Sequence, residues 1–327
     1  MALSCKPVAS FFAILWLCQP AFAEWHFRDH EIFGTSVGVQ LWLEDAAHAD
    51  HAHKSAEQEM WRIHNALSPY IESSELSLLN KNAYSGPVKV SDELAELIDK
   101  SLFYSRTSNG AFDITFASLG HLFDYREGIQ PNQEQVAELT KSINYRLVDF
   151  DEATREVRFL SPNVKIDLGG IAKGYAVDQA IKILSNQGIK HATVSAGGDS
   201  RVLGDKRGDP WIVGIKNPRS DETAIRIPLE DFAISTSGDY ERFFIDAETD
   251  ERVHHILNPS TGRSAVGVSS VSVIGPKGFD TDPLSTTIFV LGMEKGLALI
   301  EKFDDFDAII IDLTGKVHFS SGLQPPE

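Results

Sequence analysis

The chain has 327 residues, of which 42% are hydrophobic and 24% are charged, a balance typical of a folded globular protein. Its 30 basic and 47 acidic residues give a formal charge of −17. That charge argues against a nucleic-acid partner, because binding phosphates requires a basic surface. No apolar run reaches the roughly 20 residues that a membrane-spanning helix needs, so we expect no transmembrane segment in the mature chain.

The first 23 residues have the layout of a secretory signal peptide. Lys6 is their only charged residue, residues 8–18 are apolar, and Ala23 ends a small-residue motif suited to cleavage. Lipoprotein processing needs a small residue before the modified cysteine, and Leu17 stands before Cys18. We therefore expect cleavage after Ala23 and no lipid anchor.

Cleavage changes both the charge and the thiol content. Removing 23 of the 327 residues leaves 304, with a charge of −18, because the segment carries one lysine and no acid. Cys5 and Cys18 are the only cysteines and both leave with it. A cysteine-free exported protein suits an oxidising compartment, which predicts a periplasmic location without disulfides or cysteine-bound metal.

Hydrophobic patterning predicts an α+β (mixed α/β) fold, with one integrated domain over residues 24–327 and mixed sheets flanked by helices. In chain order, the patterns indicate a strand over 34–43, helices over 45–67 and 91–105, strands over 146–150, 156–159 and 164–168, a helix over 172–187, strands over 191–195, 211–216, 224–228 and 268–274, helices over 282–290 and 295–303, and a strand over 308–313.

The densest cluster of chemically suggestive residues spans 165–178. A predicted strand ends in Asp167-Leu168-Gly169-Gly170 and a helix begins at once. Glycines let a ligand approach the backbone, and a helix start favours anions. Lys173 in the first turn opposes the helix dipole, so an anionic ligand explains it better than helix stability does. An ordinary strand–helix turn remains the alternative.

Two further clusters carry polar groups at strand ends. Residues 195–199 form a second glycine turn, in which Asp199 either orients a ligand or caps the turn. Residues 234–242 gather hydroxyls and charges. Eighteen residues after Ser237, His255 stands beside the turn-forming Asn-Pro-Ser-Thr-Gly, where it could act as an acid or base. Of the pair His254–His255, one histidine is expected to be only packed or solvated.

Two candidate metal sites follow from ligand spacing. Asp282 and Thr286 lie four residues apart on a predicted helix, and both offer the hard oxygens that Mg²⁺ prefers. A capping aspartate followed by an unrelated hydroxyl is the plainer alternative. His48, His51 and His53 could bind a transition metal, although surface histidines in such a helix are usually solvated.

Eight segments in register resemble the FAD:protein FMN transferases, also called the ApbE or flavin-trafficking family. The resemblance covers nearly all of residues 33–312. Its segments are Phe33-Gly34-Thr35, residues 68–80, residues 110–115, residues 167–178, residues 196–199, residues 237–244, residues 254–262 and residues 282–287. Phe33 departs from the family's usual methionine but keeps the position apolar.

This resemblance implies an enzyme that binds FAD with Mg²⁺ and transfers the FMN half to a threonine or serine hydroxyl of an acceptor flavoprotein, releasing AMP. His255 matches the histidine placed for proton transfer. The matching metal ligands are Asp282, Thr286 and the carbonyl of Gly170. The matching FAD-contacting positions are Phe33, Tyr70, Ala111, Phe112, Asp113, Asp167, Lys173 and Ile256.

Other functions use the same features. An Mg²⁺-dependent FAD hydrolase would need the same site with water as the nucleophile. A non-catalytic periplasmic flavin-binding protein would need the pocket without the Asp282–Thr286 pair. A metal-binding protein would rely on the histidines between residues 48 and 53.

Overall fold

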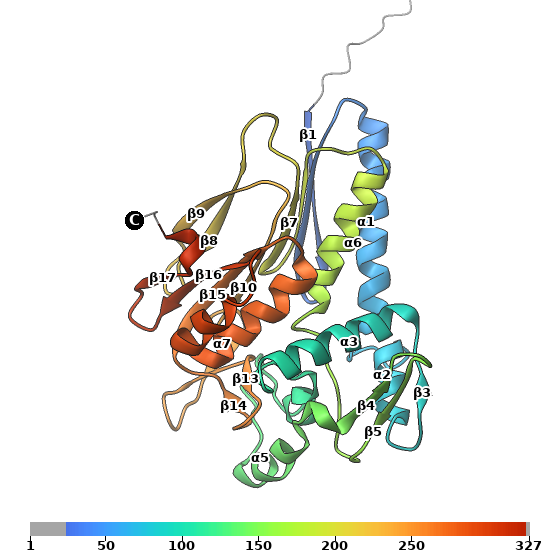
Figure 1. Ribbon diagram of the computed structural model, residues 1–327, viewed down its shortest axis with the longest axis vertical. Helices are drawn as coiled ribbons and strands as arrows, with labels where there is room; N and C mark the ends of the chain where they lie inside the picture. The colour runs from blue at the N-terminus through green and yellow to red at the C-terminus, as the bar shows by residue number, and fades with distance from the viewer. Residues whose placement is uncertain (1–23, 325–327) are drawn as a thin grey trace, which may run out of the picture.

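The computed structural model describes residues 24–324, so the predicted signal peptide lies outside the described residues. Its centre is an eight-stranded sheet in which every neighbouring pair is antiparallel (Figure 1). In spatial order the strands are β1 (Glu24–Ile32), β2 (Thr35–Leu43), β6 (Ala192–Ala196), β7 (Asp199–Leu203), β10 (Ala233–Gly238), β15 (Val268–Gly275), β16 (Asp307–Asp312) and β17 (Val317–Phe319).

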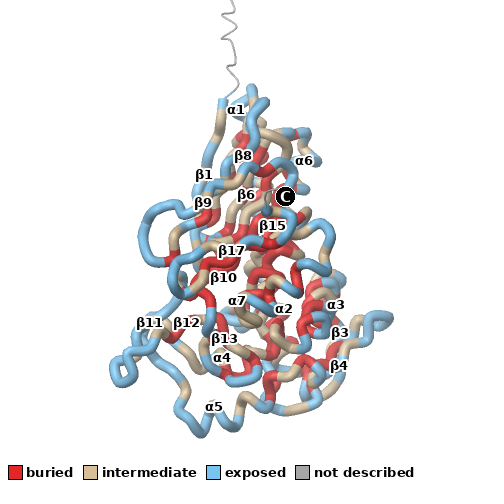
Figure 2. The backbone as a smooth tube through the Cα atoms, turned by 60° about the vertical axis from the view of Figure 1, so that its left-hand side comes forward, coloured by how far each residue is buried: buried red, intermediate tan, exposed pale blue. Residues whose placement is uncertain are grey.

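The two faces of this sheet bury separate cores, which run through the interior in Figure 2. One face packs against α1 (Ala46–Leu67), α6 (Ala172–Asn186) and α7 (Gly278–Ile300), and the other against the hairpin of β8 (Trp211–Lys216) and β9 (Thr223–Leu229). Successive side chains of strand β16 point to the two cores in turn. Ala308 and Ile310 join the helix-side core, whereas Ile309 and Ile311 join the hairpin-side core.

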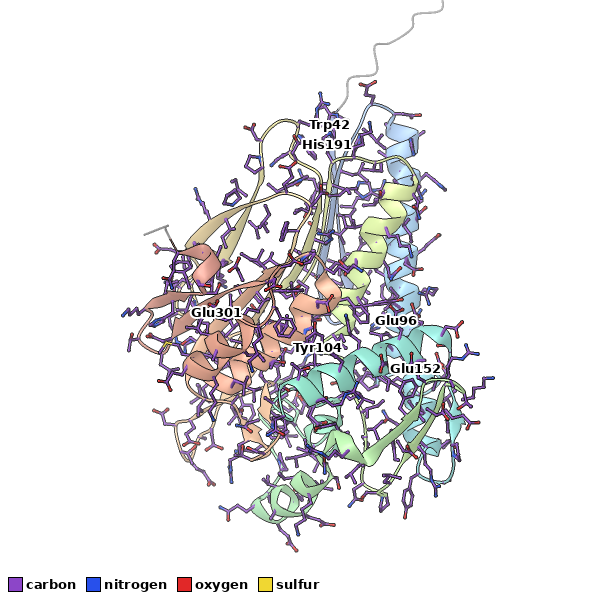
Figure 3. The ribbon with its side chains drawn as sticks, viewed as in Figure 1. Trp42, Glu96, Tyr104, Glu152, His191 and Glu301 are labelled. Atoms are coloured by element: carbon purple, nitrogen blue, oxygen red, sulfur yellow. The ribbon has the colours of Figure 1, made fainter. Side chains whose placement is uncertain are left out.

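A smaller lobe lies below the helices in Figure 1. It holds α2 (Glu75–Asn82), α3 (Asp92–Thr107), α4 (Ala117–Gly120), α5 (Gln133–Leu139) and a three-stranded sheet of β3 (Val88–Lys89), β5 (Glu156–Phe159) and β4 (Val148–Asp151). The hydroxyl of Tyr104 in α3 donates to Asp280 in α7 at 2.6 Å, which joins the two parts (Figure 3). Three short 3₁₀ helices, Ile114–Phe116, Thr140–Ser142 and Tyr145–Leu147, complete this lobe, and a fourth, Ser321–Leu323, lies near the C-terminus.

The α+β prediction is confirmed, and most predicted elements are present within a few residues. The strand predicted over 164–168 is wrong, because that segment pairs with no strand. Side chains satisfy its backbone instead. The Asn80 amide accepts from the N–H of Ile166 at 2.8 Å and donates to its carbonyl at 2.9 Å. An extended, apolar segment without a ladder partner looks like a strand in sequence alone.

Strands β1, β7 and β10 have no counterpart among the predicted elements. In β10 the sequence is rich in serine and threonine, which favours a loop by composition. These hydroxyls are nevertheless paired inside the fold, with Ser235 bonded to Thr281 of α7 at 2.7 Å and Ser237 bonded to Ser285 at 2.9 Å. Hydrogen bonding between a strand and a helix thus replaces apolar packing along this interface.

Helix α7 joins the two helices predicted over 282–290 and 295–303. Gly292 has φ 75° and ψ 179°, so the helical geometry breaks there. Among the described residues, α7 is the one helix long and apolar enough to cross a membrane. It packs on β10 and β15 of the sheet, however, and half of its most apolar stretch is buried inside the fold.

Helices α6 and α7 cross at two glycines, which predicts a strongly destabilising substitution. A Cβ on Gly174 would lie 2.0 Å from the carbonyl oxygen of Gly278 and 2.7 Å from Cβ of Asp282. Since both neighbours are fixed, Gly174→Ala must push the helices apart, and we expect a loss of about 3 kcal/mol in unfolding free energy. Urea denaturation measures this loss.

Gly86→Ala is the matched control, because a Cβ there meets nothing within 4 Å. If Gly174→Ala and Gly86→Ala had equal stability, the tight crossing would be contradicted.

Candidate functional site

The three predicted metal ligands come together where α6 begins beside α7. A Cβ on Gly170 would lie 3.6 Å from Oγ1 of Thr286, so these two residues are neighbours. Asp282 is 3% exposed, and its Oδ2 accepts from the N–H of Gly174 at 3.0 Å. Its Oδ1 has no hydrogen-bond partner among residues 24–324. A carboxylate, a hydroxyl and a backbone carbonyl form a donor set that fits Mg²⁺.

Lys173 is held by acidic side chains of the protein. Its ammonium lies 2.7 Å from Asp199 and 3.5 Å from Asp282, and it donates to the carbonyl of Gly169 at 3.3 Å. Burial disfavours its charge, but the two carboxylates outweigh burial and raise the pKa of Lys173. Burial and the charge of Asp199 likewise raise the pKa of Asp282. Lys173 therefore offsets the charge of protein carboxylates, and its contact with an anionic ligand stays a prediction.

The two adjacent histidines differ in their hydrogen bonding. His254 uses both ring nitrogens, with Nε2 2.8 Å from the carbonyl of Ala265 and Nδ1 accepting from the N–H of Ile256 at 3.3 Å. Nδ1 of His255, in contrast, is buried without a hydrogen-bond partner. Burial, helped by the charge of Arg242, lowers the pKa of His255 to about 3. At neutral pH the imidazole is uncharged, with a nitrogen able to accept a proton from a ligand.

Arg242 brings a cation to the predicted flavin site. Its Nη2 donates to the carbonyls of Phe33 and Gly34 at 3.4 Å each, and no carboxylate lies within ion-pair distance of it in the described chain. Phe33 and Gly34 form the two-residue turn between β1 and β2, with φ of 57° and 67°. Both angles are left-handed, as a type I′ turn requires. This turn and Arg242 thus lie at one edge of the site.

Other predicted FAD-contacting residues surround these groups. Phe112 is buried, with its ring 3.2 Å from the Cβ position of Gly170. Asp113, beside the half-buried Ala111, is fully engaged within the protein, accepting from Thr115 and from the N–H of Tyr145.

The remaining predicted contacts differ in exposure. Tyr70 is 89% exposed on the loop after α1, and Ile256 is buried next to His255. Asp167 accepts from the N–H of Gly169 at 2.7 Å, and burial raises its pKa.

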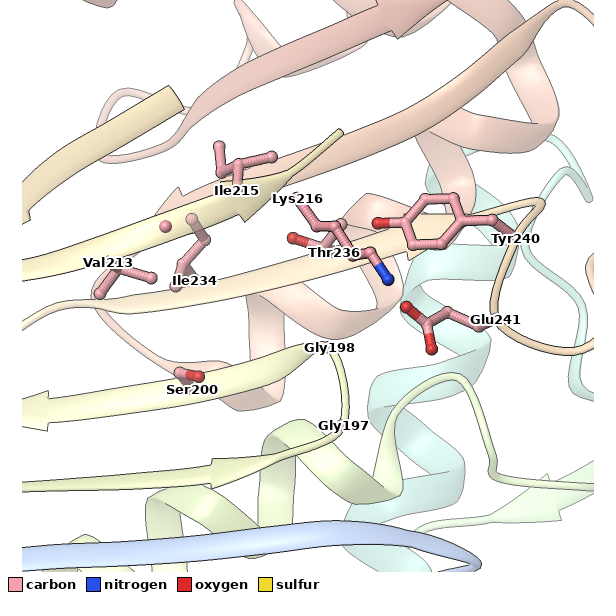
Figure 4. Close-up of a pocket in the computed structure, with 11 residues that line it drawn as sticks. Gly197, Gly198, Ser200, Val213, Ile215, Lys216, Ile234, Thr236, Tyr240 and Glu241 are labelled. Atoms are coloured by element: carbon pink, nitrogen blue, oxygen red, sulfur yellow. The ribbon is translucent and has the colours of Figure 1, made fainter. Parts of the chain in front are cut away.

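A cavity of about 160 Å³ lies behind the Gly197–Gly198 turn, between β8 and β10 (Figure 4). Lys216, Tyr240 and Glu241 line its polar end. None of the predicted site residues lines this cavity. The candidate site is the set of groups around Asp282 and His255, and these two residues do not line the cavity.

His48, His51 and His53, which the sequence left open as a metal site, do not come together as one within residues 24–324. His53 is 1% exposed and faces the sheet, whereas His51 is exposed on the other side of α1. No group of three metal-binding side chains of the His, Cys, Asp or Glu type occurs within residues 24–324. Helical spacing alone could not show which histidines point inward.

The buried His53 predicts acid sensitivity. Both ring nitrogens lack partners, and burial, with the charges of Arg28, His26 and His30, lowers its pKa from 6.5 to about 4, while Asp50 opposes the shift. Between these values the unfolded chain binds a proton that the folded chain does not, so stability falls as pH falls. At pH 5 this difference in proton binding lowers the free energy of unfolding by about 2 kcal/mol.

Chemical denaturation of wild type and His53→Phe at pH 7.5 and pH 5 measures the effect. We expect the variant to lose about 2 kcal/mol less on acidification. Equal losses in both proteins would refute the assignment.

Two residues of the site were missed as site residues by sequence reasoning. Arg242 stands in the sequence among the hydroxyl and charged residues of 234–242, and Asp199 follows a glycine turn, where an aspartate can also act as a cap. The sequence signal for Asp199 was an acidic residue directly after a glycine turn, together with a lysine, Lys173, in the first turn of another helix. The spatial pairing of Asp199 with Lys173 appears only in three dimensions.

Known proteins resemble this chain over most of its length. The ApbE family model matches residues 33–310. A Treponema pallidum protein named FAD:protein FMN transferase is 32% identical over 320 residues, covering 90% of this chain and 87% of that protein. A Haemophilus influenzae protein of the same name is 30% identical, covering 82% and 81%.

Solved structures agree with these relatives. An ApbE protein from Thermotoga maritima is 33% identical, with a TM-score of 0.84 over 91% of this chain and 98% of that one. The flavin transferase ApbE from Vibrio cholerae is 26% identical, with a TM-score of 0.81 and the same coverage. The match to the family model, the relatives and the fold agree, and this chain belongs to the ApbE family.

Proposed function

We propose that this chain is an exported FAD:protein FMN transferase that uses Mg²⁺ to attach FMN to a threonine or serine of an acceptor flavoprotein, releasing AMP. The observation that carries the proposal is the meeting of Gly170, Asp282 and Thr286 next to α6. The names of the relatives, all transferases, support the same class of enzyme.

The residues have separable tasks in this reaction. Asp282, Thr286 and the carbonyl of Gly170 would hold Mg²⁺, which when bound neutralises phosphate charge and favours departure of AMP. Arg242 offers positive charge beside the Phe33–Gly34 turn, which helps a chain of charge −17 bind an anionic substrate.

The transfer step needs one proton acceptor. The acceptor hydroxyl oxygen forms a bond to the FMN phosphorus, the pyrophosphate P–O bond breaks, and AMP leaves with that electron pair. The imidazole of His255, uncharged at neutral pH, takes the hydroxyl proton.

A transfer assay tests the proposal. The mature chain is incubated with FAD, Mg²⁺ and exported flavoprotein domains, and the products are examined for AMP and for covalent flavin fluorescence in denaturing gels. We expect both AMP and labelled protein. AMP without labelled protein would favour an FAD hydrolase, and flavin binding without AMP would favour a carrier.

A further inference from the structure

A short hairpin leads directly to His255 and offers an open strand edge. It consists of β11 (Phe243–Ile245) and β12 (Arg252–His254), which pair only with each other among the described strands. Arg242 precedes the first strand and His255 follows the second, so both site residues stand at the base of the hairpin.

The hydrogen-bond register shows which backbone groups of the hairpin face outward. The N–H of His255 donates to the carbonyl of Arg242 at 3.1 Å, and the N–H of Asp246 donates to the carbonyl of Glu251 at 2.9 Å. In an antiparallel ladder, alternate residues form the hydrogen-bonded pairs. Residues 242, 244 and 246 therefore face β12, and residues 243 and 245 direct their N–H and C=O groups away from it.

The two edges of the hairpin differ in how they are covered. On the β12 side, Oγ of Ser264 bonds both the N–H and the carbonyl of His254 at 2.8 Å each. On the β11 side, the outward groups of Phe243 and Ile245 have no hydrogen-bond partner within residues 24–324. These two residues are 36% and 47% exposed. This edge is thus accessible from solvent.

The open edge is held in a fixed position by the neighbouring loop. The rings of Tyr125 and Phe244 lie 6.4 Å apart, and the Gln130 amide donates to Asp246. Tyr125 also packs edge-on against His255, with 6.5 Å between ring centroids. An edge already held in its binding conformation loses less entropy when a partner pairs with it.

We propose that an extended segment of the acceptor protein binds as an added strand along the outer edge of β11. This inference rests on the proposed function. Phe243 and Ile245 would each supply one N–H and one C=O, the recognition mode of strand addition. Strand residues advance about 3.3 Å each. The residue one position beyond the partner of Phe243 therefore lies opposite Arg242, and His255 lies on the other side of Arg242.

Ile245→Pro tests this docking edge, because it removes an outward N–H without removing a bond to β12. The probe is a synthetic peptide spanning the residue of the acceptor domain that the wild-type chain labels. We expect its KM to rise about tenfold, with FAD affinity and melting temperature unchanged. Ile245→Ala keeps the N–H and is the matched control, expected to stay near wild type.

A second measurement leaves the enzyme unaltered. The peptide is N-methylated at one backbone position at a time, and transfer by the wild-type chain should weaken at every second position of the bound segment. An unchanged KM for Ile245→Pro, or an equal effect of N-methylation at neighbouring peptide positions, would refute β11 as the docking edge. Neither result would bear on the transfer reaction itself. If the wild-type chain releases AMP but labels no acceptor, the proposed function fails and the docking edge fails with it.

Discussion

Asp282→Asn should abolish Mg²⁺-dependent transfer, with a loss of at least about a thousandfold in kcat/KM. The substitution removes the negative charge from the buried carboxylate, whose Oδ1 is available for a cation. Folding should survive, because Lys173 keeps its 2.7 Å ion pair with Asp199. Calorimetry of Mg²⁺ binding in the presence of FAD and a transfer assay measure the two expected losses.

Thr286 supplies the matched controls for this prediction. Thr286→Ser keeps the hydroxyl and should remain close to wild type, whereas Thr286→Val removes it and should weaken Mg²⁺ binding. Full Mg²⁺ affinity and full transfer in Asp282→Asn would exclude this carboxylate as a ligand.

His255→Ala should lower the transfer rate by about a hundredfold to ten-thousandfold while FAD affinity stays near wild type. The reason is the loss of the imidazole that takes the proton of the acceptor hydroxyl in the proposed reaction. The pKa of His255 is lowered to about 3, so protonation of this group removes no activity between pH 8 and pH 5. Single-turnover transfer and equilibrium FAD binding separate the two quantities.

His254 gives a contrast to His255. Its ring bonds Ala265 and Ile256, so replacing it should lower the melting temperature, an effect that His255→Ala should not share. A His255→Ala variant with full transfer would remove this residue from the reaction.

Helices α1 and α3 were predictable because local signals agreed with the final packing. Ser91 caps α3 by accepting from the N–H of Leu94 at 3.2 Å, as expected from its place before an apolar periodic run. Helix α1 ends at Leu67, directly before Ser68 and Pro69. Such features depend on neighbours in the chain, which a sequence displays.

The crossing of α6 and α7 could not be predicted, because it depends on two glycines about a hundred residues apart. Gly174 lets α6 approach Gly278, and this approach brings Asp282 to the N–H of Gly174. The oxygen donors of Asp282 and Thr286 and their spacing of four residues made these two residues candidate metal ligands. Their position beside Gly170 follows from the helix crossing.

The same limit applies to charge and burial. Lys173 looked like an anion-binding lysine, but its carboxylate partners come from β7 and α7. His48, His51 and His53 looked alike in sequence, but only His53 faces the sheet. Which face of a helix is covered depends on the whole fold.

The groups around Asp282 and His255 are proposed to transfer FMN from FAD to a protein hydroxyl. Mass spectrometry of an acceptor domain after incubation with the chain, FAD and Mg²⁺, with AMP measured in the same sample, tests this transfer. We predict one FMN phosphoester on a threonine or serine for each AMP released, and none with Asp282→Asn. AMP release with an unmodified acceptor would exclude the transferase, and labelling that persists in Asp282→Asn would exclude Asp282 as a ligand needed for transfer.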